Sequence, residues 1–158
     1  MKDKSELKGI GGWLIFIAIG VFLGPFIALG VDFTAYAPYF EGGDFWGSYN
    51  YVSSTIPNFS ILFWPETLYA IILDFFLFYL LYLFIKKNKF FPVLYIRIVY
   101  VQIIYVIIDY GLVYLLLGDE YFAIGALEAR AIMQLLITLI IWVPYMHKSV
   151  RVKNTFIN

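Results

Sequence analysis

Four ionisable side chains lie inside segments that are otherwise almost entirely apolar. Asp74, Arg97, Asp109 and Arg130 are each flanked on both sides by apolar or aromatic residues. A charge within hydrocarbon is costly, so such groups face the interior of a helix bundle, where they pair with one another or form part of a path for ions or protons. These residue types therefore predict either structural ion pairs or a membrane transport site.

Depth along the helices predicts the partners. Asp109 and Arg130 each lie ten residues, about 15 Å, from the Asp119-Glu120 turn between their helices. Antiparallel neighbours would place them at one level, which predicts an Asp109–Arg130 ion pair. Asp74 and Arg97 differ by about 6 Å in depth, a gap that an arginine side chain can bridge. They form the second predicted pair.

Other polar residues share the same segments, namely Glu66, Gln102, Glu128 and Gln134. Glu66 and Glu128 lie near the outer ends of their helices, where water can reach them, so the two remaining acids balance the two arginines. Surplus carboxyl groups deeper inside would instead carry protons or bind a cation, as in coupled transporters. The interpretation as two structural ion pairs needs no chemistry and is preferred.

No combination of side chains points to a reaction. The chain has no cysteine, which excludes a thiol nucleophile and a thiolate metal site, and His147 has no second histidine with which to hold a metal. The matched catalytic groups of an intramembrane protease are also missing. We therefore expect no enzyme activity, no catalytic residue, no metal and no cofactor. We also expect no nucleic-acid partner, because scattered basic residues are the only feature that could attract one.

The composition is that of an integral membrane protein. Of the 158 residues, 63% are hydrophobic and 14% are charged, and the mean hydropathy is +0.84. Four apolar segments are long enough to cross about 30 Å of hydrocarbon as helices. The predicted fold is a single all-α domain, residues 1–158, that forms a bundle of four antiparallel transmembrane helices over residues 13–31, 65–85, 92–117 and 122–145. An aromatic outer loop over residues 32–60 either caps the bundle or offers a surface to a ligand.

Basic residues are confined to one side of this arrangement. Nine of the 11 Lys and Arg residues lie in the amino terminus, the turn at residues 86–89 and the carboxy-terminal tail, and none lies in the two opposite connections. The positive-inside rule then places both termini in the cytoplasm. Lys148, Arg151 and Lys153 of the tail are candidates to contact anionic lipid headgroups, each contributing about 1 kcal/mol.

Three blocks of residues resemble a known family. They are Gly11-Gly12-Trp13-Leu14 at the first helix, Phe91-Pro92 with Tyr95-Ile96 after the basic turn, and Arg130, Val143-Pro144-Tyr145, Ser149, Arg151-Val152-Lys153 and Thr155-Phe156 near the carboxy terminus. Their order and spacing are similar to those of the bacterial membrane family named domain of unknown function 2569. The resemblance implies four helices in a bacterial inner membrane and carries over no activity.

The sequence thus predicts a multi-pass inner-membrane protein without a named reaction. The favoured function is non-enzymatic contact with membrane lipids, and with membrane proteins or a second copy of the chain. The alternative is a small oligomeric transporter or channel that uses buried carboxyl groups to couple to protons or cations. A water-filled cavity that reaches Asp74 and Asp109 would favour the alternative.

Overall fold

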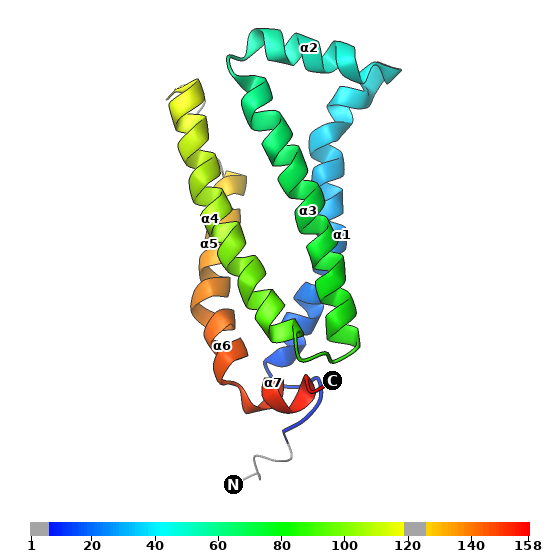
Figure 1. Cartoon of the computed structure of the whole chain (residues 1–158), viewed down its shortest axis with the longest axis vertical. Coiled ribbons are helices and arrows are strands. Elements are labelled where there is room, and N and C mark those ends of the chain that lie inside the picture. The colour runs from blue at the N-terminus through cyan, green and yellow to red at the C-terminus, as the bar shows by residue number, and fades with distance from the viewer. Residues whose placement is uncertain (1–6, 119–125) are drawn as a thin grey trace.

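A computed structural model describes residues 7–118 and 126–158, without the side chains of residues 126–128. The regular structure in these ranges is entirely helical (Figure 1). Four stretches are long and apolar enough to cross a membrane: Leu14–Gly43, Phe59–Ile85, Phe91–Leu117 and Ala129–Lys148. The predicted all-α fold with four membrane-spanning helices is therefore confirmed.

The first helix is longer than predicted. α1 spans Leu14–Phe40, whereas the sequence predicted an end at residue 31. Asp32 does not stop it, because aromatic residues at helical spacing follow. The helix ends where Gly42 and Gly43 adopt φ values of 82° and 77°, which glycine tolerates without steric strain.

A helix also occupies the middle of the predicted outer loop, residues 32–60. α2 spans Phe45–Thr55 and lies across the ends of α1 and α3 (Figure 1). It begins at Asp44, whose carboxylate accepts a hydrogen bond of 2.8 Å from the backbone N–H of Gly47. The buried Tyr49 anchors it, with its ring centroid 5.3 Å from that of Phe63. The loop prediction is therefore corrected, because aromatic packing makes this segment helical.

The two central helices agree more closely with the prediction. α3 spans Phe59–Ile85 and begins upstream of the predicted start at residue 65, so that Pro65 lies inside the helix. The upstream turns pack their aromatic side chains against α1 and α2, which favours helix there despite the proline. α4 spans Phe91–Leu117, with Pro92 in the first turn.

The last membrane-spanning helix changes its winding near its end. α5 spans Ala126–Ile137, a π-helical turn covers Thr138–Trp142, and α6 spans Val143–Lys148. The wider turn precedes Pro144, which has no N–H and would crowd the carbonyl of the preceding turn in a regular α-helix. The predicted start of this helix at residue 122 lies outside the described residues.

The buried core lies at the end of the molecule that holds the start of α1 and the carboxy-terminal tail. It comprises Leu14, Ile17, Ala18, Val21, Leu80, Leu83, Phe84, Phe91, Ile96, Ile98, Val99, Val143, Met146, Val152 and Phe156. Toward the opposite end α1 and α3 move apart (Figure 1), whereas α3 and α4 stay in contact, because the Asn58 side chain donates to the Leu116 carbonyl at 3.1 Å. Buried side chains of α1, α3, α4 and α6 meet at the first of these ends, which is the packed end of the molecule.

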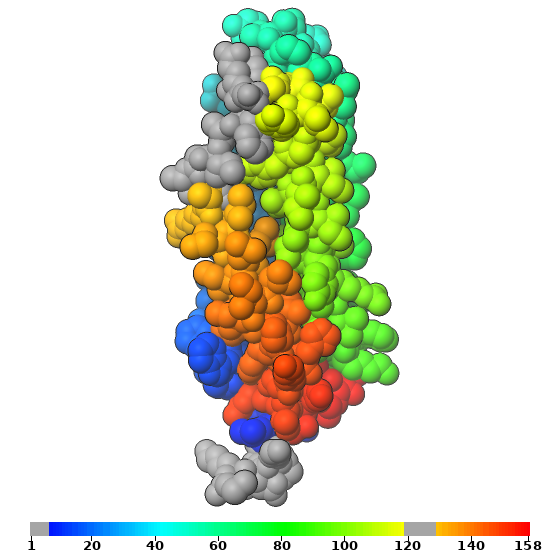
Figure 2. Space-filling view, turned by 90° about the vertical axis from the view of Figure 1, so that its left-hand side faces the viewer, coloured from blue at the N-terminus to red at the C-terminus, as the bar shows by residue number. Residues whose placement is uncertain are grey.

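The carboxy-terminal tail is tied into this core. α7 spans Val150–Thr155, and Figure 2 shows the red tail filling the lower end of the molecule. The Gly9 N–H donates to the Thr155 hydroxyl at 2.9 Å, and the Lys89 N–H donates to the Asn158 carbonyl at 2.8 Å. These bonds hold the tail against the amino-terminal segment and the turn between α3 and α4.

Aromatic contacts at this end join residues far apart in the sequence. Phe156 of the tail stacks on Phe91 of α4 at a centroid distance of 4.5 Å, and Phe91 meets Phe84 of α3 at 5.0 Å. Trp13 lies 5.9 Å from Trp142. Parts of all three residue blocks that carry the family resemblance thus meet at the packed end.

Candidate functional site

The structure forms neither of the two predicted ion pairs. Arg97 and Arg130 are exposed, and neither makes an ion pair with an acid in the described part of the chain. Counting residues gives depth along a helix but not rotation about its axis. Asp74 lies on the face of α3 that packs toward α1, so it cannot meet Arg97 of α4.

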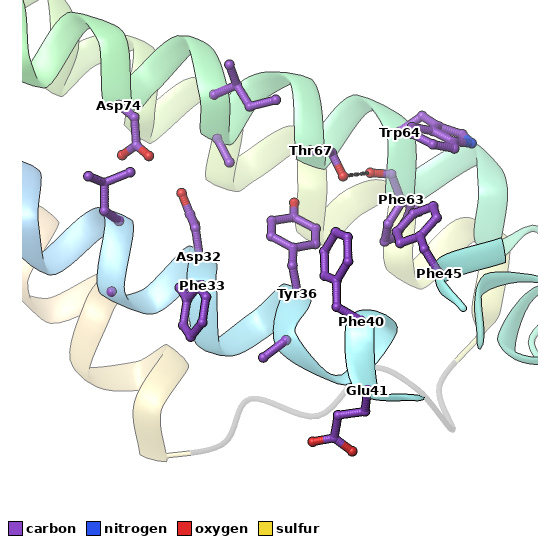
Figure 3. Close-up of a pocket in the computed structure, with 15 residues that line it drawn as sticks. Asp32, Phe33, Tyr36, Phe40, Glu41, Phe45, Phe63, Trp64, Thr67 and Asp74 are labelled. Carbon is purple, nitrogen blue, oxygen red and sulfur yellow. Dashed lines mark hydrogen bonds between the residues drawn. The ribbon is translucent and has the colours of Figure 1, made fainter. Parts of the chain in front are cut away.

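Asp74 instead faces another acid. Its carboxyl group and that of Asp32 on α1 point toward one another (Figure 3) and come within hydrogen-bonding reach. The Oδ1 atom of Asp74 is buried and has no hydrogen-bond donor among the described groups. A hydrogen bond between two carboxyl groups requires a proton on one of them. The Asp32–Asp74 pair is therefore a place where a proton or a cation would be held.

A second pair of acids joins α3 to α4. Glu66 and Asp109 also lie within hydrogen-bonding reach, and Tyr105 lies next to Asp109. The ring of Tyr105 stacks on that of Tyr69 at 3.4 Å, which holds the tyrosine in place beside the acids. On α3 the two pairs are eight residues, about 12 Å, apart. They therefore occupy two levels of the membrane-spanning region.

A cavity of about 910 Å³ reaches the Asp32–Asp74 pair. It lies between α1 and α3 beneath α2, and six aromatic side chains line it: Phe33, Tyr36, Phe40, Phe45, Phe63 and Trp64. The cavity thus reaches Asp74, one of the two acids that the expected water-filled path would have to reach, and its lining is largely apolar. Asp109 does not line this cavity.

The remaining predicted polar residues lie elsewhere. Gln102 and Gln134 line a second cavity, of about 350 Å³, between α1, α4 and the last membrane-spanning helix. The side chain of Glu128 lies outside the described residues. No group of three or more His, Cys, Asp or Glu side chains that could hold a metal occurs in residues 7–118 and 129–158.

The three headgroup candidates of the tail differ from one another. Arg151 turns inward, with Nη1 3.5 Å from the carbonyl oxygen of Gly9. A Cβ atom at Gly11 would come within 2.6 Å of that nitrogen, so the glycine leaves room for the guanidinium. Lys148 and Lys153 are both exposed, but of the two only Lys153 lines a pocket beside α4.

Sequence reasoning missed the partner acids, Asp32 and Glu66. Asp32 was assigned to the outer loop, and Glu66 was set aside as water-accessible. One signal could have corrected the first assignment. Aromatic residues at positions 33, 36 and 40 continue the helical spacing beyond Asp32, which favours a longer helix.

Comparison with known proteins gives a family and nothing more specific. A family model described as a protein of unknown function (DUF2569) matches residues 7–157, nearly the whole chain. No curated protein and no solved structure matches the chain.

Proposed function

The chain belongs to this family of unknown function, and from that premise we propose that it is a small membrane transporter whose carboxyl pairs exchange protons for a cationic solute. The observation that carries the proposal is the Asp32–Asp74 contact at the wall of a cavity. Both acids lie in helices long enough to span a membrane, and neither has a basic partner among the described residues.

The chemistry of exchange follows from the contact. Two carboxylates in contact inside a membrane-spanning region repel one another strongly, so the pair favours either a shared proton or a bound cation. Binding a cation releases the proton, and binding a proton releases the cation. The aromatic side chains that line the cavity favour cations with apolar substituents, because ring faces attract positive charge. No enzymatic step is part of this proposal.

Infrared difference spectra of the purified protein in lipid test the exchange. We expect a band from protonated carboxyl groups that disappears as the pH is raised and loses amplitude in Asp74→Asn. Asp44→Asn is the matched control, because it removes a carboxylate from the connection between α1 and α2 while asparagine still caps α2. Sodium, potassium or tetraethylammonium added at fixed pH should remove part of the same band.

Two outcomes would contradict the transporter proposal. A titrating band that is identical in the wild type and in Asp74→Asn would show that the Asp32–Asp74 pair holds no proton. A band that titrates but responds to none of the three cations would leave the pair as a structural feature without exchange.

A second candidate function is non-enzymatic contact with lipids, membrane proteins or a second copy of the chain. It is supported by the packed end, where the tail places basic residues beside the basic turn between α3 and α4. This candidate does not require a proton or a cation at the carboxyl pairs, so the infrared experiment separates it from the transporter.

We further propose that both termini are cytoplasmic and that the membrane is a bacterial inner membrane. The start of α1 and the carboxy-terminal tail lie at one end of the molecule, with the basic turn between α3 and α4 (Figure 1). In intact cells a tag inserted at Gly43 should react with an impermeant label, and tags at either terminus should react only after lysis. Labelling of a terminal tag in intact cells would overturn the orientation.

A further inference from the structure

A pocket of about 560 Å³ at the packed end gathers four basic side chains. Lys89 lies in the turn before α4, Arg97 lies in the second turn of α4, His147 lies in α6 and Lys153 lies in α7. No acidic residue is among the side chains that line the pocket. The pocket is separate from both carboxyl pairs, so a ligand bound there is independent of the proposed transport.

The pocket has an apolar wall as well as a charged one. On α4 the residues Val93, Ile96 and Tyr100 line it on the same side as Arg97. Arg97 lies six residues, about 9 Å, beyond Phe91 along α4, whereas Lys89 precedes the helix. The basic groups therefore extend from the end of the helix toward the apolar region, and a long arginine side chain can keep its charge near the headgroups.

The fold places these groups together from distant parts of the sequence. Lys153 is brought to α4 because Thr155 bonds Gly9 and Phe156 stacks on Phe91. Lys148 is next to His147 in the sequence but does not line the pocket. Of Lys148 and Lys153, only Lys153 therefore lies at the pocket.

We propose that this pocket binds one anionic phospholipid. The basic side chains hold the phosphate of the headgroup, and an acyl chain lies against Val93, Ile96 and Tyr100. Basic pockets between helices on the cytoplasmic side recognise anionic headgroups in this way. Free phosphate would satisfy the charges alone, whereas the apolar wall fits the acyl chain of a lipid.

Native mass spectrometry of the full-length protein measures retention of the lipid. The protein is equilibrated with equal amounts of phosphatidylglycerol and phosphatidylcholine, and one retained phosphatidylglycerol is expected. In the triple variant Lys89→Gln, Arg97→Gln and Lys153→Gln, the preference for phosphatidylglycerol should fall about a hundredfold, because each surface cation contributes roughly a fivefold preference. Lys148→Gln, which removes a neighbouring charge outside the pocket, should retain the wild-type preference.

The outcomes that overturn the proposal do not depend on the triple variant folding. Equal retention of the two lipids by the wild-type protein would contradict it. So would an equal loss of preference in Lys148→Gln and in Lys153→Gln, since that would indicate general surface attraction. A thermal stabilisation by inorganic phosphate as large as that by phosphatidylglycerol would assign the pocket to a soluble anion instead.

Discussion

Phe91→Ala is expected to lower the free energy of unfolding by about 3–5 kcal/mol, whereas Phe90→Ala should change it by less than about 0.5 kcal/mol. Phe91 is 0% exposed and contacts the rings of Phe84 and Phe156, while Phe90 is 59% exposed. Alanine at position 91 leaves a cavity where α3, α4 and the tail meet. Reversible unfolding of the purified protein in detergent micelles measures both changes.

Phe90 is a matched control for Phe91. Both variants lose the same atoms from adjacent positions, so any difference between them comes from the packing of the side chain. Equal destabilisation by the two substitutions would mean that the helices are not joined through Phe91. The location of the core at the packed end would then be wrong.

The second large effect concerns the residue that partners Asp109. The structure gives Glu66 as the partner, whereas helix depth predicted Arg130. Glu66→Ala and Asp109→Ala should each destabilise the protein, because each leaves a carboxyl group without its partner, and the double substitution should recover part of the loss. We expect a coupling energy of about 1–3 kcal/mol for this pair. Asp109→Ala and Arg130→Ala should be additive to within about 0.5 kcal/mol, because the structure does not join these residues.

The cycle for Glu66 with Asp109 and the cycle for Asp109 with Arg130 distinguish the carboxyl pair from the ion pair. Strong coupling of Asp109 to Arg130 would restore the ion pair that helix depth predicted. Strong coupling to Glu66 supports the carboxyl pairs on which the transporter proposal rests. The cycles use the same stability assay, so no knowledge of the solute is required.

Much of the architecture could be predicted from local features of the sequence. Hydrophobic runs of spanning length determine four helices, because a backbone in hydrocarbon must satisfy its hydrogen bonds within the helix. The α3–α4 turn was located well because its lysines interrupt the apolar run between Ile85 and Phe91. The predicted first helix ends at residue 31, just before Asp32, and so does not include the extension to Phe40.

The candidate site could not be predicted in the same way. Residue counting determined the depths of Asp74 and Asp109 and the presence of acids inside the membrane-spanning segments. Only the tertiary structure decided that Asp74 meets Asp32 and that Asp109 meets Glu66. The physical reason is that a side chain's partner depends on the rotation of its helix about its own axis. Packing between helices distant in sequence determines that rotation, and at the packed end it also brings Lys153 to Arg97.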